Sequence, residues 1–505
     1  MQLFVTMLAL LLGATALSAV AKRLNIPYPT VLAVGGGIAA FIPGTSQFDL
    51  PPDLILALFV APVLLDAAYD ASLRDLRKNG PTILSLVLMA VGLTTVTVAV
   101  TARLLFPEMP WAAAVALGAL LAPPDAVAAL AVLRQVHPPH RIRMVLEGES
   151  LLNDASALLI YRLAVGAVAV GGFDAVGAIP MFGVVVLGSV VAGWLLSWPA
   201  GWLIRRIDDA PSNVIVQFVI TFGVWLAAEY LHLSGVVTIV VFAMTLARRQ
   251  TTPARVRIPS FAIWETMTFV LNVLAFTLIG LQVRPTFLAL SGAERQHYLL
   301  ASLVILVAVI GIRIIWVLMH HLLAQWRPHP ETARSAKGAV VIAWSGMRGI
   351  VTLAAAMALP GEFPYRDFIE LTAFVVVLGT LVIQGMTLGP LLALLRMPRD
   401  SVIDSELHAA RKAALQAALN AIDGDESPAA QRLRLEYGEA LSQARHGRNP
   451  RDRLDNVLRQ RAIAAGRTAI SELRSSDAIG DDAYRRMEEE LDWLELSSRP
   501  ARTDG

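Results

Sequence analysis

The sequence predicts an all-α polytopic membrane protein with about thirteen helical spans and a small helical tail. Three observations predict this class. The 505-residue chain is 56% hydrophobic and only 16% charged, with a mean hydropathy of +0.60, whereas soluble domains are about 25% charged. Its apolar residues gather in stretches long enough to cross a bilayer. Residues 1–395 hold 24 of the 42 Lys and Arg and 20 of the 40 Asp and Glu, so the remaining 18 and 20 fall in the last 110 residues.

Composition excludes several other classes. The chain contains no cysteine, which excludes disulfides, thiolate catalysis and cysteine-bound metals. Its net charge of +2 is too small to indicate a nucleic-acid partner. No nucleotide or metal motif is visible in the tail, so we expect no cofactor and no enzymatic activity.

Thirteen apolar stretches are long enough to cross a hydrocarbon core about 30 Å thick as helices, whose backbone polar groups bond internally. The second and ninth are short. The predicted spans lie near residues 2–21, 27–43, 52–70, 82–105, 110–132, 144–168, 180–203, 212–231, 234–248, 261–282, 298–323, 338–358 and 369–394.

Loop charge predicts the orientation of these spans, because cytoplasmic loops are enriched in Lys and Arg. Loops after odd-numbered spans carry 17 basic residues: Lys22, Arg23, Arg74, Arg77, Lys78, Arg134, Arg141, Arg143, Arg205, Arg206, Arg248, Arg249, Arg255, Arg257, Arg327, Arg334 and Lys337. Loops after even-numbered spans, with the adjoining helix ends, carry 5: Arg103, Arg162, Arg284, Arg295 and Arg366. This alternation places the N-terminus outside and the tail in the cytoplasm.

The first span differs from a cleaved signal peptide in the position of its charges. A signal peptide has basic residues before its apolar run, whereas Lys22 and Arg23 follow it here. We therefore expect residues 2–21 to remain as a membrane helix that enters from outside.

Ionisable side chains in hydrocarbon are costly and by default mark ion or proton paths. In span 3, Asp66 lies deeper than Asp70 and is a candidate for a cation path or for pairing with an arginine. Span 5 contains Pro123, Pro124 and Asp125. Because proline cannot donate a backbone hydrogen bond, the helix should break there, and in transporters such breaks occur beside ion sites. We assign Asp125 to the cation and proton site.

Span 6 contains the strongest polar cluster. Glu149 and Asn153 are four residues apart, as are Ser150 and Asp154, so the four side chains share one helical face. A carboxylate beside hydroxyl and amide oxygens suits a hard cation such as Na⁺ and also binds a proton. Polar contacts between helices would explain the serine and the asparagine, but not two carboxylates as well. We therefore expect Asp154 to bind Na⁺ or a proton, but not both together.

Span 12 predicts a second interrupted helix, because Gly346 and Gly349 flank Arg348. Arg348 should neutralise a carboxylate in the membrane, with Glu149 as the first choice and Asp66 as the second. His320 and His321, near the cytoplasmic end of span 11, are interpreted as interfacial side chains, with pH sensing as the alternative.

The charged tail predicts amphipathic helices near residues 402–421, 429–445, 451–475 and 482–497. We expect a regulatory or assembly role for it. The predicted domains are therefore a transmembrane domain, residues 1–395, and a cytoplasmic helical tail, residues 396–505.

Five motifs, in order along the chain, resemble those of the monovalent cation:proton antiporter-1 family, which includes bacterial NhaP-type antiporters and animal sodium/proton exchangers. Asp66 stands at the acidic position of a segment similar to the family's Leu-Pro-Pro-x-x-x-Asp/Glu. Residues 149–154, Glu-Ser-Leu-Leu-Asn-Asp, match the family's Glu-Ser-x-x-Asn-Asp at every defined position. Residues 261–281, 346–349 and 384–388 resemble its Trp-Glu…Asn…Phe…Gly-Leu helix and its two late motifs. Where the family has Pro-Thr-Asp-Pro, this chain has Pro123-Pro124-Asp125-Ala126, which keeps the break but removes a threonine oxygen.

The resemblance implies a dimeric antiporter with two inverted six-helix repeats and two crossed discontinuous helices, spans 5 and 12, at the ion site. It implies that Asp154 is the shared carboxylate for cation and proton, with Asn153 as its structural neighbour. Ser150 and Asp66 would lie in or near the ion path. Glu149 and Arg348 would form a structural ion pair. The Asn-Asp pair implies electroneutral exchange.

The sequence therefore predicts a secondary transporter in a bacterial inner membrane that exchanges Na⁺, Li⁺ or K⁺ for H⁺ and contributes to pH homeostasis. An ion-coupled transporter of a small organic anion is the alternative, since broken-helix ends also hold carboxylates. A channel would use the same carboxylates. An intramembrane aspartyl protease is disfavoured, because Tyr69-Asp70 matches only half of that motif.

Overall fold

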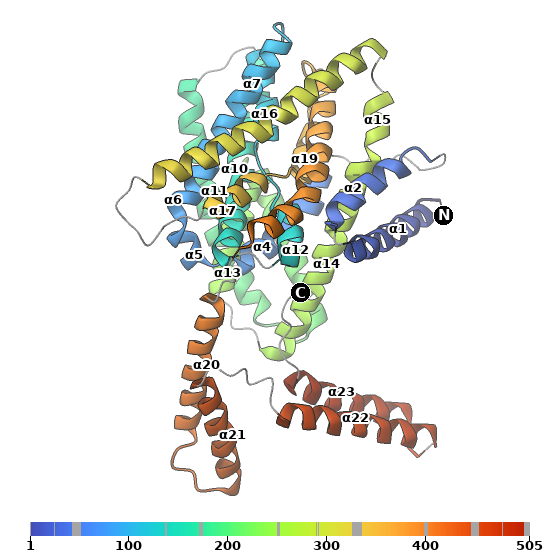
Figure 1. Cartoon of the computed structure of the whole chain (residues 1–505), viewed down its shortest axis with the longest axis vertical. Helices are drawn as coiled ribbons and strands as arrows, with labels where there is room; N and C mark the ends of the chain where they lie inside the picture. The colour runs from blue at the N-terminus through green and yellow to red at the C-terminus, as the bar shows by residue number, and fades with distance from the viewer. Residues whose placement is uncertain are drawn as a thin grey trace. The chain divides into compact units, whose positions relative to one another are not determined.

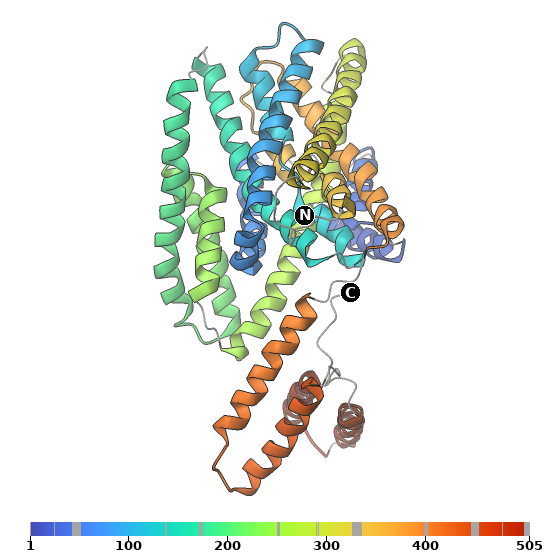
Figure 2. The same cartoon turned by 60° about the vertical axis from the view of Figure 1, so that its left-hand side comes forward.

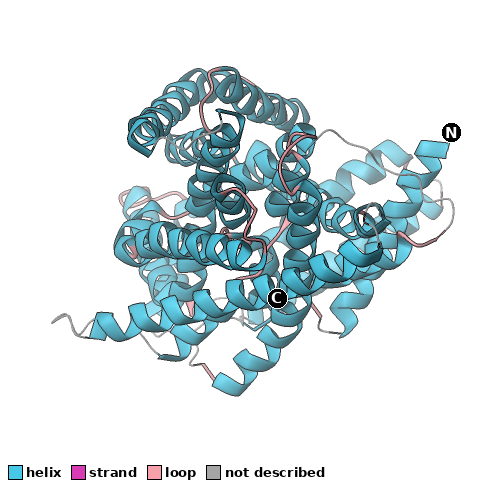
Figure 3. Ribbon diagram, turned by 90° about the horizontal axis from the view of Figure 1, so that it is seen from above, coloured by secondary structure: helices cyan, strands magenta, loops and turns pink. Residues whose placement is uncertain are grey.

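The computed structural model describes residues 2–24, 26–42, 52–136, 139–170, 175–249, 253–288, 290, 292–325, 336–397, 402–445, 454–476 and 478–498. Every regular element within these residues is a helix, and Figure 3 accordingly contains only helix and loop colours. The all-α prediction is confirmed. The chain divides into two compact units, Met1–Pro398 and Arg399–Gly505.

Each predicted span corresponds to a helix or to a short series of helices in the first unit (Figure 1). The uninterrupted helices are α1 (Gln2–Leu24), α2 (Tyr28–Ala39), α10 (His140–Val170), α11 (Ala175–Ile204), α12 (Ala210–Tyr230), α13 (Gly235–Arg249), α14 (Ala254–Leu281), α16 (Gly292–Gln325) and α19 (Arg366–Leu395). Among the described residues, seven helices are long and apolar enough to cross a membrane. The protein is thus a multi-pass membrane protein. Arg327 and Arg334 of the loop count lie outside the described residues.

Spans 3 and 4 each contain a π-helical turn. Span 3 consists of α3 (Pro52–Ile55), the π-helical η1 (Leu56–Val60) and α4 (Ala61–Asp70). Span 4 consists of α6 (Gly80–Leu84), the π-helical η2 (Ser85–Ala90) and α7 (Val91–Leu105). A π-helical turn holds an extra residue, so it changes which face the following side chains present. Two short helices, α5 (Leu73–Lys78) and α15 (Val283–Leu288), lie in connections.

Spans 5 and 12 are interrupted where the sequence analysis expects breaks. Span 5 consists of α8 (Trp111–Leu121) and α9 (Ala126–Val136), separated by residues 122–125. Span 12 consists of α17 (Ala336–Trp344) and α18 (Ile350–Met357), separated by residues 345–349. The two interruptions meet, because the backbone N–H of Asp125 donates to the carbonyl oxygen of Met347 at 2.7 Å. Each break thus satisfies a backbone group that the other leaves free, as buried non-helical backbone in a membrane requires.

Three large apolar clusters hold most of the buried core of the first unit. One, which includes Leu117, Ile305 and Phe368, joins α8 to α16 and α19. Another joins α2 and α14 to α9 and α19 through Leu32 and Phe276. The third joins α4 to α11, α12 and α13, and Figure 2 shows α11 alongside α13 on one side of the unit. The outward faces of α11 and α16 expose large apolar side chains, as expected of helices that contact lipid.

The second unit consists of two helical hairpins. α20 (Val402–Ala421) packs on α21 (Pro428–Arg445), and α22 (Leu454–Ser475) packs on α23 (Asp481–Ser498). Arg467 of α22 pairs with Glu495 of α23 at 2.5 Å, and Arg459 of α22 pairs with Glu436 of α21 at 2.8 Å. In each hairpin, apolar residues at helical spacing form a narrow buried strip. Leu441 of α21 and Ile470 of α22 are among these buried residues.

Candidate ion-binding site

A cavity of about 100 Å³ lies beside the point where the two interrupted helices meet. Its walls come from η1, α4, α9, α10, α14 and α18 and from both breaks. Six of its lining residues have polar side chains: Asp125, Glu147, Ser150, Asp154, Asn272 and Thr352. Among the described residues that line it, none is Arg, Lys or His. The cavity is therefore a mainly apolar chamber with carboxylate, hydroxyl and amide oxygens, which are the ligands that hard cations prefer.

Asp154 and Ser150 face this cavity from one side of α10, as the four-residue spacing predicts. Asp154 is 7% exposed. Burial in a low-dielectric site disfavours a bare carboxylate, so a proton or a cation must neutralise it. Two ions that compete for one buried carboxylate are what an exchanger requires.

Asp125 reaches the same cavity from the first break, and its two carboxylate oxygens face different neighbours. Its Oδ1 accepts a hydrogen bond from the backbone N–H of Val127 at 2.8 Å, at the start of α9. Its Oδ2 lies against the second break, where a Cβ on Gly349 would stand 1.8 Å from it. Only glycine at position 349 leaves room for this carboxylate. The two predicted break motifs are therefore complementary in shape as well as in hydrogen bonding.

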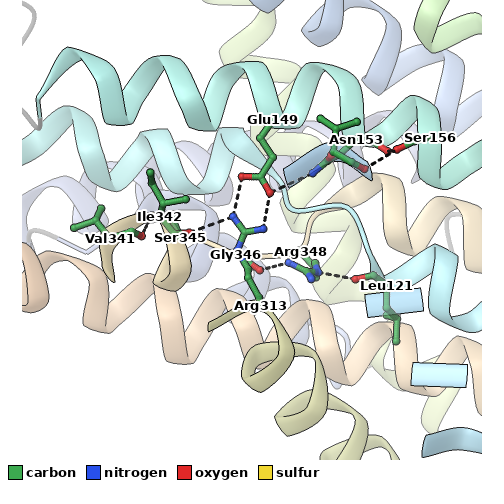
Figure 4. A network of polar contacts seen from close by, with 11 residues as sticks. Leu121, Glu149, Asn153, Ser156, Arg313, Val341, Ile342, Ser345, Gly346 and Arg348 are labelled. Atoms are coloured by element: carbon green, nitrogen blue, oxygen red, sulfur yellow. Dashed lines mark hydrogen bonds and ion pairs between the residues drawn. The ribbon is translucent and has the colours of Figure 1, made fainter. Parts of the chain in front are cut away.

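In a buried hydrogen-bond network beside the cavity, the partner of Glu149 differs from the predicted one. Glu149 is paired with Arg313 of α16 rather than with Arg348 (Figure 4). The two guanidinium nitrogens of Arg313 donate to the two carboxylate oxygens at 2.5 and 2.9 Å, and the side-chain amide of Asn153 donates to Oε1 at 3.2 Å. Glu149 and Asn153 are 0% and 1% exposed. This forked geometry is the strongest that Arg and a carboxylate form.

Arg348 instead binds backbone carbonyls at the two breaks (Figure 4). Its Nε donates to the carbonyl oxygen of Leu121, the last residue of α8, at 2.7 Å, and its guanidinium also donates to the carbonyl oxygen of Gly346. Its backbone N–H donates to Oγ1 of Thr380 at 3.0 Å. The predicted Glu149–Arg348 pair is wrong because the end of an interrupted helix presents unsatisfied carbonyls, which attract a cation as a carboxylate does.

Asp66 is not brought to this cavity. It lines a second cavity of about 50 Å³, together with Tyr69, Gln217 and Trp264. Leu64 lines the first cavity and Leu65 the second, so the two cavities lie on different faces of α4. Trp264 donates to Gln217 at 2.6 Å in the wall of the second cavity.

Four residues of the site were not predicted from the sequence. Arg313 is visible as an arginine inside a span, but its partner is 164 residues away in the chain. Glu147 lies seven residues before Asp154 and thus on the same face of α10, a periodicity that the sequence does contain. Asn272 and Thr352 are single polar residues within apolar helices. Nothing in the sequence distinguishes Thr352 from an ordinary interhelical polar contact, whereas Asn272 is the asparagine of the motif at residues 261–281.

Comparison with known proteins identifies the family. Residues 7–394 match the family described as "Sodium/hydrogen exchanger, transmembrane". An uncharacterized Na⁺/H⁺ exchanger of Mycobacterium tuberculosis is 30% identical over 97% of this chain and 95% of its own. A sodium, potassium, lithium and rubidium/H⁺ antiporter of Bacillus pumilus is 30% identical over 84% of this chain and 66% of its own.

A solved structure has the same fold. The sodium proton antiporter MjNhaP1 of Methanocaldococcus jannaschii, at pH 8, superposes with a TM-score of 0.59. The superposition covers 78% of this chain and 99% of that one, at 17% identity. The predicted antiporter fold and the predicted family are confirmed. This chain belongs to the sodium/hydrogen exchanger family, whose members are transporters that exchange monovalent cations for protons.

Proposed function

We propose that this protein exchanges a monovalent cation for a proton at the carboxylate of Asp154, with Asp125 and Ser150 as neighbouring oxygen ligands. One observation carries the proposal: these three residues share a cavity that no basic residue of the described chain lines. The two buried arginines nearby are engaged, Arg313 by Glu149 and Arg348 by backbone carbonyls. A buried carboxylate without a protein cation needs a proton or a metal cation.

The exchange cycle follows from this competition. Asp154 releases its proton to one side, binds the cation, and the loaded site then becomes accessible from the other side. The interrupted helices α8–α9 and α17–α18 provide an element able to alternate, since their ends hold each other by few hydrogen bonds. The residue before Asp154 is Asn153, which carries no titratable proton, and this supports an electroneutral cycle of one cation for one proton.

Na⁺ and Li⁺ are the proposed cations, with K⁺ as a further substrate. The relative from Bacillus pumilus is named for sodium, potassium, lithium and rubidium. Pro124 offers no side-chain oxygen at the first break, so the site has fewer fixed ligands. Fewer fixed ligands impose a weaker size limit on the ion.

We further propose that the protein is a homodimer in a bacterial inner membrane, with its N-terminus outside and its tail in the cytoplasm. The dimer follows from the family resemblance. The orientation follows from the ratio of 17 to 5 basic residues between alternate loops.

Proton movement in everted membrane vesicles tests the proposed exchange. A pH gradient is formed first, a pH-sensitive dye reports it, and Na⁺, Li⁺ and K⁺ are added in turn. We expect cation-triggered collapse of the gradient in the wild type and none in Asp154→Asn. Asp70→Asn, which neutralises an exposed carboxylate outside the cavity, is the matched control and should behave as the wild type. Folded wild-type protein that responds to none of the three cations would favour an organic-anion transporter instead.

A further inference from the structure

A second kind of site lies where four helix ends meet. A cavity of about 70 Å³ is bounded by the starts of α6, α10 and α17 and by the last turns of α16. Arg141, His320 and His321 contribute basic side chains to its wall. Most of the remaining lining is aliphatic: Leu86, Ile142, Val145, Val317, Ala339 and Ile342. The lining is therefore amphipathic, and we refer to its three basic side chains as the basic corner and to its six aliphatic side chains as the aliphatic wall.

Arg141 provides the charge of the basic corner. It is partly buried, yet its side chain forms no ion pair or hydrogen bond with any residue that the structure describes. No carboxylate lies among the described residues that line the cavity. Asp75 of α5, a helix that contacts α10, is engaged by His140 at 3.2 Å. A partly buried guanidinium without a counter-ion is unfavourable, so an external anion would stabilise this corner.

The anion that fits is a phosphate attached to an acyl chain. Guanidinium forms two parallel hydrogen bonds with phosphate, and imidazole N–H groups add further donors. A free phosphate would leave the aliphatic wall unfilled. Near the cavity, α16 exposes Leu318, Met319 and Leu322 by 36%, 41% and 59%, as a lipid-facing helix does. We propose that this cavity binds an anionic phospholipid, with its phosphate at Arg141 and His320 and an acyl chain along the aliphatic wall.

Such a lipid would stabilise the helices that carry the buried ion pair. Ile342 lines the cavity, and its carbonyl oxygen accepts a hydrogen bond from Arg313 at 3.2 Å. Arg313 in turn binds Glu149 of α10. The lipid and the ion pair therefore contact the same three helices, α10, α16 and α17. Lipid binding should raise the thermal stability of the protein, whether or not Asp154 exchanges ions.

The test is lipid binding and thermal stability of the purified full-length chain in detergent. Phosphatidylglycerol and phosphatidylcholine with identical acyl chains are compared by native mass spectrometry and by melting temperature. We expect phosphatidylglycerol to be retained and to raise Tm more than phosphatidylcholine does. Arg141→Gln should weaken phosphatidylglycerol binding by about tenfold, the usual effect of losing one charge-assisted contact. Arg248→Gln, an equal loss of charge at an exposed helix end, should bind as the wild type does.

Three results would overturn the proposal. Equal binding of phosphatidylglycerol by wild type and Arg141→Gln would remove the basic corner from the site. Equal stabilisation by phosphatidylcholine would show that headgroup charge is irrelevant. Equal stabilisation by inorganic phosphate or glycerol phosphate would indicate a soluble anion rather than a lipid. If Arg141→Gln fails to fold, Arg141→Lys keeps the charge and loses the forked geometry, and it should bind phosphatidylglycerol more weakly than the wild type.

Discussion

Glu149 and Arg313 are both almost fully buried, and two hydrogen bonds join the guanidinium of Arg313 to the two carboxylate oxygens of Glu149. Such a pair adds little net stability compared with apolar residues, but removing one partner leaves an isolated charge in the membrane. We therefore interpret the pair as an interaction that fixes how α10 and α16 pack against each other. Asp154, one turn along α10, owes its position in the cavity to that fit.

Arg313→Gln should lower the free energy of unfolding by about 3–5 kcal/mol, because Glu149 would remain charged and buried. Thermal melting of the purified protein measures the loss. Arg162→Gln is the matched control, since it breaks an exposed pair with Glu229 at 2.7 Å and should cost at most about 1 kcal/mol. Adding Glu149→Gln to Arg313→Gln removes both charges and should recover part of the loss. A double variant as unstable as the sum of the single ones would contradict this account.

Glu147 is a second residue whose position in the cavity suggests a role. It lies on the face of α10 that carries Ser150 and Asp154, and Arg143 pairs with it at 2.7 Å at the solvent-exposed end. Because its charge attracts cations toward the cavity, Glu147→Gln should raise KM for Na⁺ by about 3- to 10-fold at low ionic strength. The maximal rate should be unchanged, since the exchanging carboxylate that we propose is Asp154.

Initial rates of proton movement at a series of Na⁺ concentrations measure this effect. The difference in KM should shrink as ionic strength rises, because screening weakens the attraction. Glu229→Gln, which neutralises a paired carboxylate outside the cavity, should leave KM unchanged. An unaltered KM in Glu147→Gln would assign the residue to stability alone.

At the scale of elements, the two interrupted helices depend on glycine for their close approach. A Cβ on Gly349 would stand 1.8 Å from Oδ2 of Asp125, and a Cβ on Gly346 would stand 2.3 Å from the Arg313 side chain. Neither neighbour can move freely, because Asp125 is bonded at its other oxygen and Arg313 is held by Glu149. The second break is thus packed against Asp125, which lines the cavity, and against Arg313 of the buried ion pair.

Gly349→Ala should abolish exchange and lower the melting temperature, because the methyl group displaces the Asp125 carboxylate. Gly311→Ala in α16 is the matched control: no atom lies within 4 Å of its added methyl group. That control should be neutral or stabilising, since alanine favours a helix over glycine by about 1 kcal/mol. Dye-reported exchange and thermal melting of both variants give the comparison. Full activity in Gly349→Ala would mean that the Asp125 carboxylate need not stay at the second break.

Asp75 in α5, the connection between spans 3 and 4, should make the stability of the protein depend on pH. Partial burial raises the pKa of Asp75 in α5, but hydrogen bonds from Ser72 and His140 and the charge of Arg74 lower that pKa more, so it ends below its usual value. The contact therefore contributes stability above the unfolded-state pKa of about 3.9, and this contribution is lost as pH falls through the folded-state pKa.

Asp75→Asn should therefore destabilise the protein by about 1 kcal/mol at pH 7, and its melting curve should converge with that of the wild type below about pH 4. Melting temperatures from pH 7 to pH 3 test this. Glu108→Gln, at an exposed loop position, should follow the wild type throughout. A difference between Asp75→Asn and wild type that does not shrink as pH falls from 5 to 3 would assign the effect to packing.

Which of these features the sequence predicts depends on whether the signal is local. The thirteen predicted spans coincide with helices because apolar length is a local property, and the breaks are predicted because Pro123, Pro124 and the glycines act locally. The partner of Glu149 is not recovered, because Arg313 and Arg348 both lie in the membrane and only the packing of α16 chooses between them. The face of Asp66 is not readable either, since η1 precedes it and alters the helical phase.

At the scale of the whole molecule, helix ends that adjoin basic loops meet on one side of the membrane-spanning unit. The cavity that contains Arg141 joins the ends of spans 4, 6, 11 and 12 that adjoin loops counted as basic. Four ends that the positive-inside rule assigns to one side thus meet at one place in the structure. This agreement supports the assignment of the four ends to one side of the membrane, and loop composition alone proposes that this side is cytoplasmic.

Single cysteines test that orientation, because the chain has none of its own. Ser475→Cys in the tail should react with a membrane-impermeant maleimide in everted vesicles but not in right-side-out vesicles. Glu108→Cys, in the loop after span 4, should show the opposite pattern, because an odd number of spans separates the loop from the tail. Both positions are exposed, so lack of labelling reports the membrane barrier rather than burial. Labelling of both positions from the same side would mean that an even number of spans separates them. Reversal of both labelling patterns would mean that the tail lies outside.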